Sequence, residues 1–520
     1  MKLQICHRPV RYGFLAFVVV LVCAAVRAGG AVAAPSVAET NAGAWSFQSA
    51  PALHPLRLRV RASRRGTAPG LVFTDPFKDF AIQSPLVGQP GPLIVDERGN
   101  PVWFHPLAAS LEATDFQAQR YRGQPVLTWW QGTIAIPPLY TNLPPGSPEP
   151  GAAFYIYSDH YRLIRKIVAQ NGWTADLHEF TLTPRGTALF IAAKEVPMDL
   201  TPYGGSKNGA IEDAEIQEVD LRTGRLVFHW DMLDHVSLRE AQVTPPARGV
   251  WDPYHVNSID EDSHGHLLVS ARDTWAAYAI SRKTGRVIWQ LGGKGSTFSV
   301  PPQARFYWQH DVRYRAGNQV SIFDDGCCNL PHGKPEHHAR GLVVRLDFRH
   351  HRALLVRQYE HQPAIYVPTQ GNVQYLPGGN VFIGWGQLPY YSQYTASGRL
   401  LYEVSMPMAD ESYRAFTLPW VGAPLYPPSA AVRRLHGKTV VYASWNGATR
   451  AAYWQLLGGS GTGKLKIVVG RARRRGFETA IATRAGGPFF QIRALDASGR
   501  ILKASRIMRL QQTSKLPGGY

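Results

Sequence analysis

The amino-acid sequence predicts an all-β protein. Its 520 residues include 49 Gly and 39 Pro, a high share for a helical protein, and 14 Trp, 23 Tyr and 21 Phe, which favour strands. Amphipathic segments with a period of 3.6 residues are scarce, so we expect few helices. A short sequence motif also recurs along the chain, which is typical of a fold built from repeated units. Together these observations predict an array of similar β-sheets.

The repeated motif begins with a glycine turn, continues with a basic or polar residue and ends in apolar residues followed by an aromatic residue. Glycine permits the turn, and the aromatic ring can pack between neighbouring sheets. The copies are spaced by roughly 45 to 65 residues, the length of a four-stranded unit with long loops. We therefore predict a β-propeller of about six blades over residues 76–430. The copies, of which the second and fifth are degenerate, span residues 98–103, 161–164, 223–228, 284–289, 352–356 and 397–402.

A second kind of segment follows Gly or Pro turns and consists mainly of apolar residues. Its short runs, bounded by turns, are typical of buried strands. We expect these segments to pair with the strands that the repeated motif forms. They span residues 125–129, 188–191, 267–270 and 381–384.

The N-terminus has the three parts of a secretory signal peptide over residues 1–33. A positively charged start is followed by an apolar run at 14–26, which is too short to span a bilayer, and by small residues at 31–33 that suit cleavage. The sequence therefore predicts a secreted or cell-surface protein, with a retained N-terminal membrane anchor as the alternative. Residues 34–75 form an N-terminal extension, and one expectation is that it contributes a strand that closes the propeller.

A proline-rich break between residues 419 and 428 ends the repeat array. Residues 437–510 then alternate about seven short apolar segments with turns. That length and spacing predict a small, separate β-sandwich of the immunoglobulin or fibronectin type III kind.

The chain is strongly basic, with a formal net charge of +19. Removing residues 1–33 takes away four cations and no acid, which leaves +15. This excess suits a small anionic substrate or association with an anionic cell surface. Nucleic acid is not expected as a partner, because Lys and Arg are spread along the chain and no nucleic-acid-binding motif is present. The sequence also lacks a phosphate-binding loop, a dinucleotide fingerprint and a nucleophile elbow.

Three histidines occupy matching places in three successive repeats. His178, His255 and His310 each lie about ten residues before a short hydrophobic strand. In a propeller, equivalent positions of successive blades fall on one circle around the axis. We therefore predict that the three imidazoles face one channel and form a reaction site. The strands that follow them span residues 187–192, 266–271 and 319–323.

Neighbouring residues suggest roles for these histidines. Strand alternation would place His255 and Asn257 on one face, where an imidazole could act as nucleophile or base and an amide could donate to a developing oxyanion. Asp311 could hold the tautomer of His310. The alternatives are a structural His–Asn hydrogen bond, a satisfied core histidine at 310 and, for His178 with its acidic neighbours, a simple acidic turn.

Two arginines could bind an anionic group near these histidines. Arg272 follows the strand after His255, and Arg340 opens the next strand beyond His310. A guanidinium can hold two oxygens of a sulfate or phosphate at once. The alternative for either residue is an exposed arginine at a strand end.

Three histidines also suggest a metal site, such as calcium or zinc on a propeller axis. No two of them form a local His-x-His or His-x-x-x-His pair, so no ligand spacing supports a metal, and we predict neither a metal nor a cofactor. Cys327 and Cys328 would be the only cysteines after residues 1–33 are removed. In an oxidising compartment they could close a vicinal disulfide or remain thiols, and no second pair completes a tetrahedral metal site.

Several ordered segments resemble those of the arylsulfotransferase family, in the branch found in secreted actinobacterial and fungal proteins. His255 lies in a His-x-Asn motif, and His310 lies in a Gln-His-Asp motif, both of which match that family. The final segment resembles the small sandwich domain that is often appended there. The resembling segments span residues 125–132, 176–180, 217–220, 255–258, 289–294, 309–311, 384–386 and 444–449.

The resemblance implies a six-bladed propeller that moves a sulfuryl group from a phenolic sulfate donor to a phenol acceptor without a nucleotide donor such as PAPS. It implies a ping-pong route through a sulfated histidine, with further His and Arg residues stabilising the transferred group. Arg340 is similar to the sulfate-binding arginine of the family. Tyr254 and Trp308 could stack against a phenol. The oligomeric state is not predicted.

The chain departs from the family pattern at one important place. The characterised enzymes draw their nucleophilic histidine from a late blade, and residues 371–386 contain no histidine. Gln393 also stands where the branch has an acid. Two alternatives therefore remain: a non-catalytic propeller that binds an anionic or aromatic ligand or a cell-wall component, and a quinone-dependent dehydrogenase, which residues 220–224 resemble although the repeats look too few.

Overall fold

We describe the computed structural model of the chain over residues 43–79, 85–135, 147–327, 335–435, 437–485 and 487–510. Within these residues the chain forms strands β1 to β35 and a few 3₁₀ helices of three residues each, which confirms the prediction of an all-β fold. The predicted signal peptide lies outside the described residues. In the described parts of the chain, no helix has the length and apolarity that a membrane crossing requires. The 3₁₀ helices are η2 (Thr201–Tyr203), η3 (Leu238–Glu240), η4 (Arg272–Thr274) and η5 (Pro302–Ala304).

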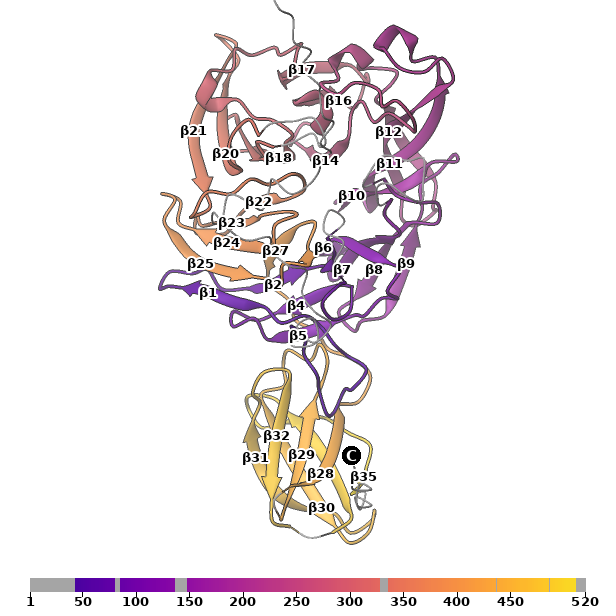
Figure 1. Ribbon diagram of the computed structural model, residues 1–520. Coiled ribbons are helices and arrows are strands. Elements are labelled where there is room, and N and C mark those ends of the chain that lie inside the picture. The colour runs from indigo at the N-terminus through magenta and orange to yellow at the C-terminus, as the bar shows by residue number, and fades with distance from the viewer. Residues whose placement is uncertain are drawn as a thin grey trace, which may run out of the picture.

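Most strands belong to antiparallel sheets of four or five strands that follow one another around a common centre, so the architecture is propeller-like (Figure 1). Each sheet is assembled mainly from consecutive strands. The sheets in the first half of the chain are β6 (Glu112–Tyr121), β7 (Gln124–Gly132), β8 (Ala153–Ser158) and β9 (Leu163–Ile167), then β10 (Thr174–Leu182), β11 (Thr187–Met198), β12 (Gly209–Asp220) and β13 (Leu226–Asp231), then β14 (Val256–Glu261), β15 (His266–Ala271), β16 (Ala276–Ser281) and β17 (Val287–Gly292).

The next sheets continue around the centre in the same manner. One of them gains β1 from the N-terminal extension as an added edge strand. These sheets are β18 (His310–Arg315), β19 (Gln319–Asp324), β20 (Arg340–Asp347) and β21 (Arg352–Glu360), then β22 (Asn372–Tyr375), β23 (Val381–Gly384), β24 (Tyr390–Tyr394), β25 (Leu400–Ser405) and β1 (Arg59–Ser63).

A further sheet joins the two ends of this region. Strand β27, which comes late in the chain, pairs antiparallel with β2 from the N-terminal extension, and a short pair formed by β3 and β26 lies next to them in the sequence. The extension thus contributes strands to two sheets. The strands are β27 (Ala415–Leu418), β2 (Leu71–Thr74), β4 (Leu93–Val95) and β5 (Pro101–Phe104), with β3 (Phe77–Lys78) and β26 (Asp410–Glu411).

The repeated motif coincides with one strand of each of these sheets. Its six copies overlap β5, β9, β13, β17, β21 and β25, each the fourth strand from the centre of its sheet. Hydrophobic clusters fill the spaces between neighbouring sheets. For example, one cluster joins Ile216 of β12 to Tyr278 of β16, and another joins Leu268 of β15 to Val344 of β20. The sheets are therefore held together face to face by apolar packing.

The C-terminal region forms two sheets that share a core built around Trp454 and Phe490. It lies at one end of the molecule (Figure 1). Its first strand begins at Ser429, ahead of the expected boundary at 437. Its strands are β28 (Ser429–Leu435), β29 (Lys438–Ser444) and β32 (Glu478–Thr483) in one sheet, with β30 (Tyr453–Gly459), β31 (Lys466–Arg473), β33 (Phe489–Leu495), β34 (Ile501–Ala504) and β35 (Met508–Arg509) in the other.

Hydrogen bonds at several places attach this region to the rest of the chain. The Asn446 side chain bonds to both the N–H and the C=O of Phe104, each at 2.9 Å, which extends the edge of β5. Near the N-terminus, Ser49 bonds to Ser444 at 2.7 Å and its N–H donates to Glu478 at 2.6 Å. The N-terminal extension therefore contacts the C-terminal region as well as the propeller-like region.

Candidate functional site

The structure brings the three predicted histidines together from three sheets. His178 lies in β10, His255 directly precedes β14, and His310 opens β18. The ring of His178 lies 4.9 Å from that of His255 and 6.3 Å from that of His310, and the rings of His255 and His310 are 6.3 Å apart, all between centroids. These residues begin or lie on the first strand of each sheet, at the centre, so equivalent positions meet there although more than fifty residues separate them.

Each imidazole has a carboxylate on its Nδ1 atom. Asp176 lies 2.7 Å from His178, Asp252 lies 2.7 Å from His255, and Asp325 lies 2.9 Å from His310. For His178 and His255, an ionised aspartate only accepts, so Nδ1 of the neutral ring carries the proton and Nε2 is the acceptor nitrogen. For His310, the same tautomer follows because its Nε2 accepts the N–H of Gln370. Burial holds the pKa of Asp325 well above its usual value. These bonds fix the tautomer and orientation of the three rings.

Local backbone geometry sets the position of His255. Asp252 accepts the backbone N–H of both Tyr254 and His255, at 3.2 and 2.7 Å, which closes a turn before β14. His255 has a φ of 48°, in the left-handed region. His255 therefore belongs to a turn and not to the regular strand. The alternation of side chains along a strand does not apply to it, so the prediction that His255 and Asn257 share a face by alternation does not hold.

His310 has a different partner from the one that its sequence neighbour suggests. Asp311 pairs with Arg313 at 2.7 Å and accepts the N–H of Val373 at 2.8 Å. Asp311 has a φ of 51° and lies at an irregularity of the β18–β19 pairing, and its carboxylate is engaged by these partners rather than by the imidazole beside it. Asp325, which follows β19, takes its place because β19 pairs with β18.

Asn257 lies in β14 and is fully buried. Its Nδ2 atom donates to the C=O of Gln309 at 2.7 Å, so the amide that we expected to stabilise an oxyanion is engaged with the backbone. Its own C=O accepts from Arg414 at 2.9 Å and from the hydroxyl of Tyr413 at 3.3 Å.

The two predicted arginines differ in their surroundings. Arg272 follows β15, its N–H donates to the C=O of His255 at 3.0 Å, and its guanidinium lies 4.9 Å above the ring of Trp308. It also pairs with Asp273 at 2.5 Å. The guanidinium of Arg340 instead bonds to Asp324, to Gln358 and to the C=O of Arg305, which ties it to the outer strands of its sheet. Arg272 is thus the arginine linked to the histidines.

The predicted aromatic residues are both buried. The Tyr254 hydroxyl donates to the C=O of Val236 at 2.6 Å, and its ring belongs to the hydrophobic cluster between two sheets. Trp308 packs under Arg272 and against Trp275. These positions make Tyr254 a core residue and make Trp308 a support for the arginine.

Sequence reasoning missed Tyr413 and Arg414, which lie at the centre of the molecule. The ring of Tyr413 stands edge-on to His178, at 5.3 Å between centroids. The guanidinium of Arg414 is almost fully buried and pairs with Asp115 at 2.8 Å, Glu179 at 3.2 Å and Asp311 at 3.7 Å. No local pattern distinguishes this arginine from an exposed one, because its partners come from three different sheets.

Burial and charge shift the three imidazoles in different directions. Burial lowers the pKa of His178 and holds the pKa of His310 well below its usual value. Burial also acts to lower the pKa of His255, but the nearby Asp252 carboxylate outweighs it and the net shift is upward. The N–H of Gln370 donates to Nε2 of His310 at 3.2 Å, which is consistent with a neutral ring at that position.

A group of buried carboxyl groups lies beside the histidines. Gln370 links them, since its side chain donates to Glu411 at 3.1 Å. Burial raises the pKa of Glu112 to about 7 and that of Asp410 to about 8, and it holds the pKa of Glu411 well above its usual value. These groups hold protons at pH values where exposed carboxyl groups have lost them.

These shifts predict that stability falls with rising pH. Between about pH 4 and pH 8, the folded chain keeps protons on Asp410 and Glu112 that the unfolded chain has released, so the free energy of unfolding decreases as pH rises. Thermal unfolding should show a lower apparent Tm at pH 8 than at pH 5. Asp410→Asn should make this dependence shallower, whereas the exposed control Asp234→Asn should leave it unchanged. A wild-type Tm that is constant or rises over this range would contradict the expectation.

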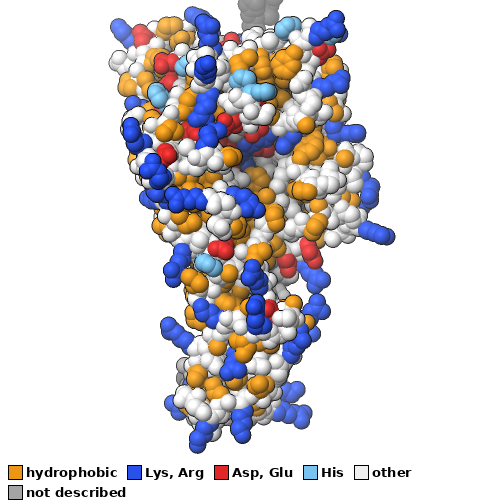
Figure 2. All heavy atoms as spheres, turned by 180° about the vertical axis from the view of Figure 1, so that it is seen from behind, with side chains coloured by type: hydrophobic (Ala, Val, Ile, Leu, Met, Phe, Trp, Pro, Cys, Tyr) orange, Lys and Arg blue, Asp and Glu red, His pale blue; other side chains and the backbone are white. Residues whose placement is uncertain are grey.

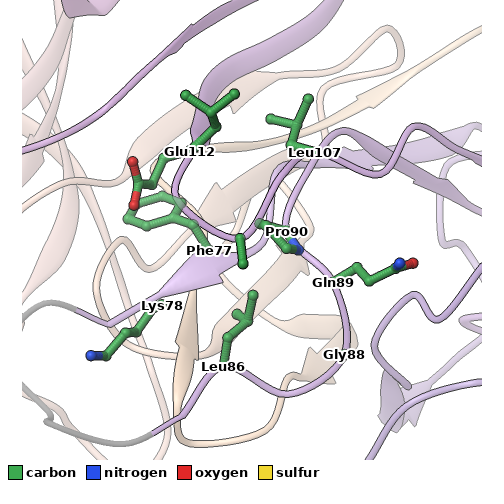
Figure 3. A pocket seen from close by; sticks show the side chains of 10 residues that line it. Phe77, Lys78, Leu86, Gly88, Gln89, Pro90, Leu107 and Glu112 are labelled. Carbon is green, nitrogen blue, oxygen red and sulfur yellow. The ribbon is translucent and has the colours of Figure 1, made fainter.

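Pockets lie beside two of the histidines and, separately, beside Glu112. The cavity beside His178 and His255 has a volume of about 10 Å³, room for about one water molecule. A larger cavity of about 420 Å³ is bounded by Phe77, Leu107 and Glu112, with Lys78 at its edge (Figure 3). The carboxyl of Glu112 thus borders the larger space, while the imidazoles border the smaller one.

The structure also bears on the predicted cysteine pair and on the distribution of basic side chains. Cys327 is buried and disulfide-bonded, and its predicted partner Cys328 lies outside the described residues. Lys and Arg side chains are scattered over the face seen in Figure 2 rather than gathered in one patch. That distribution agrees with their spread along the sequence.

Comparisons with solved structures show only remote likenesses. A protein of unknown function from Bacteroides caccae is 11% identical, covering 67% of this chain and 98% of its own, with a TM-score of 0.38. The periplasmic gluconolactonase of Pseudomonas aeruginosa is 13% identical, covering 69% and 92%, with a TM-score of 0.26. Virginiamycin B lyase from Staphylococcus aureus is 12% identical, covering 68% and 100%, with a TM-score of 0.29. TM-scores this low carry no conclusion about function.

Sequence comparisons are more informative. A search of curated proteins found no match to the chain. The sequence model of the arylsulfotransferase (ASST) family matches residues 154–406. This stretch contains His178, His255, His310 and Arg272, whereas Tyr413 and Arg414 lie just beyond it. The match therefore supports the arylsulfotransferase family for the part of the chain that carries all three histidines.

Proposed function

We propose that this protein is an exported aryl sulfotransferase that moves a sulfuryl group from a phenolic sulfate to a phenol through His255, without a nucleotide donor. The observation that carries the proposal is the meeting of three imidazoles, each with a carboxylate on Nδ1, next to Arg272. The family match adds support, because arylsulfotransferases act on small phenolic substrates. Export rests on the signal-peptide pattern of residues 1–33, with a retained anchor as the alternative.

His255 is the best placed of the three to act as nucleophile. Its side chain is 15% exposed, compared with 8% for His178 and 0% for His310, so it is the most accessible of the three rings. In the neutral form of the ring, Asp252 holds the proton on Nδ1 and the Nε2 lone pair is free to attack sulfur. His310 is buried and already accepts a backbone N–H, which suits a positioning role.

The reaction would take two displacement steps. In the first, Nε2 of His255 forms a bond to sulfur while the bond from sulfur to the aryl oxygen breaks and a phenolate leaves. In the second, the oxygen of the acceptor phenol attacks sulfur, the S–N bond breaks and its electron pair returns to Nε2. The acceptor's proton would pass to His178, whose ring is 4.9 Å away. Arg272 would stabilise the negative charge on the sulfuryl oxygens.

We also propose that the sheets around the centre are the blades of a six-bladed propeller and that the C-terminal sheets form a β-sandwich of the immunoglobulin or fibronectin type III kind. Apolar clusters between each pair of neighbouring sheets support the first, including one that joins Val404 of β25 to Val72 of β2. The core that the two C-terminal sheets share supports the second.

Release of nitrophenol from 4-nitrophenyl sulfate in the presence of phenol tests the function. The purified mature chain should release nitrophenol, and brief exposure to the donor alone should leave an acid-labile sulfuryl adduct on His255, detected by intact mass and peptide mapping. Absence of both products across a panel of phenolic sulfates would overturn the proposal.

Arg272→Gln should lower kcat/KM for sulfuryl transfer by roughly 10²-fold, the usual cost of removing one charge-stabilising donor. Arg340→Gln is the matched control, because the Arg340 guanidinium is engaged by Asp324 and Gln358, and its effect should be much smaller. Steady-state kinetics measure both variants, with thermal unfolding to check that each is folded. A larger loss in Arg340→Gln than in Arg272→Gln would reverse the assignment.

A second function has one observation in its favour. The cavity beside His178 and His255 holds about 10 Å³, which leaves no room for an aryl ring in this conformation. This geometry suits a non-catalytic protein that binds an anionic or aromatic ligand elsewhere, for instance a cell-wall component. Saturable binding of a phenolic sulfate that persists without turnover and survives His255→Ala would favour this second function.

A further inference from the structure

We propose that His178, His255 and His310 bind a single divalent transition-metal ion through their Nε2 atoms, an ion of the Zn²⁺ class. One ligand nitrogen from each ring can be chosen so that all three lie within 4.8 Å of one another. The absence of a local ligand spacing in the sequence does not argue against the site, because the three ligands come from β10, from the turn before β14 and from β18.

The surroundings of the rings match those of metal-binding histidines. Such histidines almost always donate their other ring N–H to a carboxylate or carbonyl, which fixes the tautomer and orients the ligand nitrogen. All three rings here donate from Nδ1 to an aspartate. Three neutral imidazoles with one open position form a ligand set that Zn²⁺ uses in catalytic sites, and imidazole also suits Cu, Fe and Ni.

A modest movement would complete the coordination. Zn–N bonds are about 2.0–2.1 Å, so two ligand nitrogens on one ion lie within roughly 4 Å of each other. The nitrogens here lie within 4.8 Å of one another, so any nitrogen at that limit would have to move closer to its neighbours. The N–H of Gln370 now donates to Nε2 of His310 at 3.2 Å and would lose this bond. The loss of this single hydrogen bond is small beside the free energy of binding a metal ion through three imidazoles.

A competing group of ligands shares His255 but is less suitable. Asp252, His255 and Asp273 also lie within 4.8 Å of one another. Asp252 is occupied by Nδ1 of His255, and Asp273 pairs with Arg272 at 2.5 Å. A metal there would have to break both contacts, so we assign the ion to the three imidazoles.

The metal site goes beyond the proposed sulfuryl transfer and uses the same lone pairs. An ion held by Nε2 of His255 prevents that atom from attacking sulfur. Zn²⁺ should therefore inhibit transfer by the metal-free protein, and a chelator should restore it.

Zn²⁺ titration of chelator-treated, full mature protein tests the site, with calorimetry and bound-metal analysis as readouts. We expect one Zn²⁺ per chain, a rise in apparent Tm on binding, and a visible absorption band when Co²⁺ replaces Zn²⁺. His178→Gln and His310→Gln should each abolish binding. His350→Ala is the control, since His350 is exposed and bonds to Asp347 through Nδ1 in the same way.

Asp176→Asn provides a milder test that keeps the three ligands. Loss of this carboxylate should weaken Zn²⁺ affinity by roughly 10- to 100-fold, as expected for a group that orients a ligand. Wild-type protein that binds no Zn²⁺, or binding that persists in both His→Gln variants, would overturn the site. Because binding is measured without turnover, Zn²⁺ binding in a protein with no transferase activity would remove the proposed function alone, and activity without Zn²⁺ binding would remove the site alone.

Discussion

His255→Ala should lower the rate of nitrophenol release from 4-nitrophenyl sulfate by on the order of 10³-fold or more, because the substitution removes the nitrogen that would form the bond to sulfur. The sulfuryl adduct should disappear as well. Single-turnover assays with intact-mass detection measure both effects.

The control for this prediction is His266→Ala. His266 also bonds to an aspartate through Nδ1, at 3.0 Å, but it lies at the outer end of β15 and is partly exposed. His255→Gln keeps a polar side chain next to Asp252 and guards against a loss of activity caused by misfolding. Full activity in a folded His255→Ala protein would show that another group is sulfated or that no covalent step occurs.

Arg414→Leu should have the largest effect on stability. The guanidinium is buried among Asp115, Glu179 and Asp311. Removing it takes the paired cation from Asp115 and one of two paired arginines from Glu179 and Asp311, which also pair with Arg313. Breaking a buried ion pair in this way costs about 3–5 kcal/mol. We expect the apparent Tm to fall by roughly 10 °C, measured by calorimetry or circular dichroism.

Arg500→Leu is the matched control for the buried arginine. Arg500 pairs with Asp496 at 3.1 Å, but its side chain is 74% exposed, so solvent screens the pair and the apparent Tm should hardly change. Arg414→Lys should fall between wild type and Arg414→Leu, because lysine keeps the charge but cannot contact several partners at once. A Tm of Arg414→Leu within a degree or two of wild type would show that the carboxyl groups are satisfied without the arginine.

The repeated sequence motif correctly predicted the positions of strands. Its glycine, polar and aromatic positions follow from local turn chemistry and from the packing of one strand, so they can be recognised in the sequence. The copies overlap β5, β9, β13, β17, β21 and β25. The matching places of His178, His255 and His310 were also visible, because they recur relative to the strands that follow. Asp252, three residues before His255, could have been found from the same local turn.

Other parts of the site depend on contacts between distant residues. Asp325 reaches His310 only because β19 pairs with β18, and its sequence neighbour Asp311 pairs with Arg313 instead. Arg414 gathers carboxyl groups from sheets that are separated by up to about 300 residues of chain. Neither relation has a signature in local spacing.

By itself, the sequence determined the β architecture, the positions of the repeating strands and the identity of the three histidines, since these depend on propensity and periodicity within short segments. Only the tertiary structure decided which carboxylate orients each imidazole, that Arg272 rather than Arg340 bonds to one of these histidines, and that one nitrogen from each of the three rings lies within 4.8 Å of the others. Those features are distances across the centre of the molecule, and a distance between side chains of different sheets exists only after the sheets have packed.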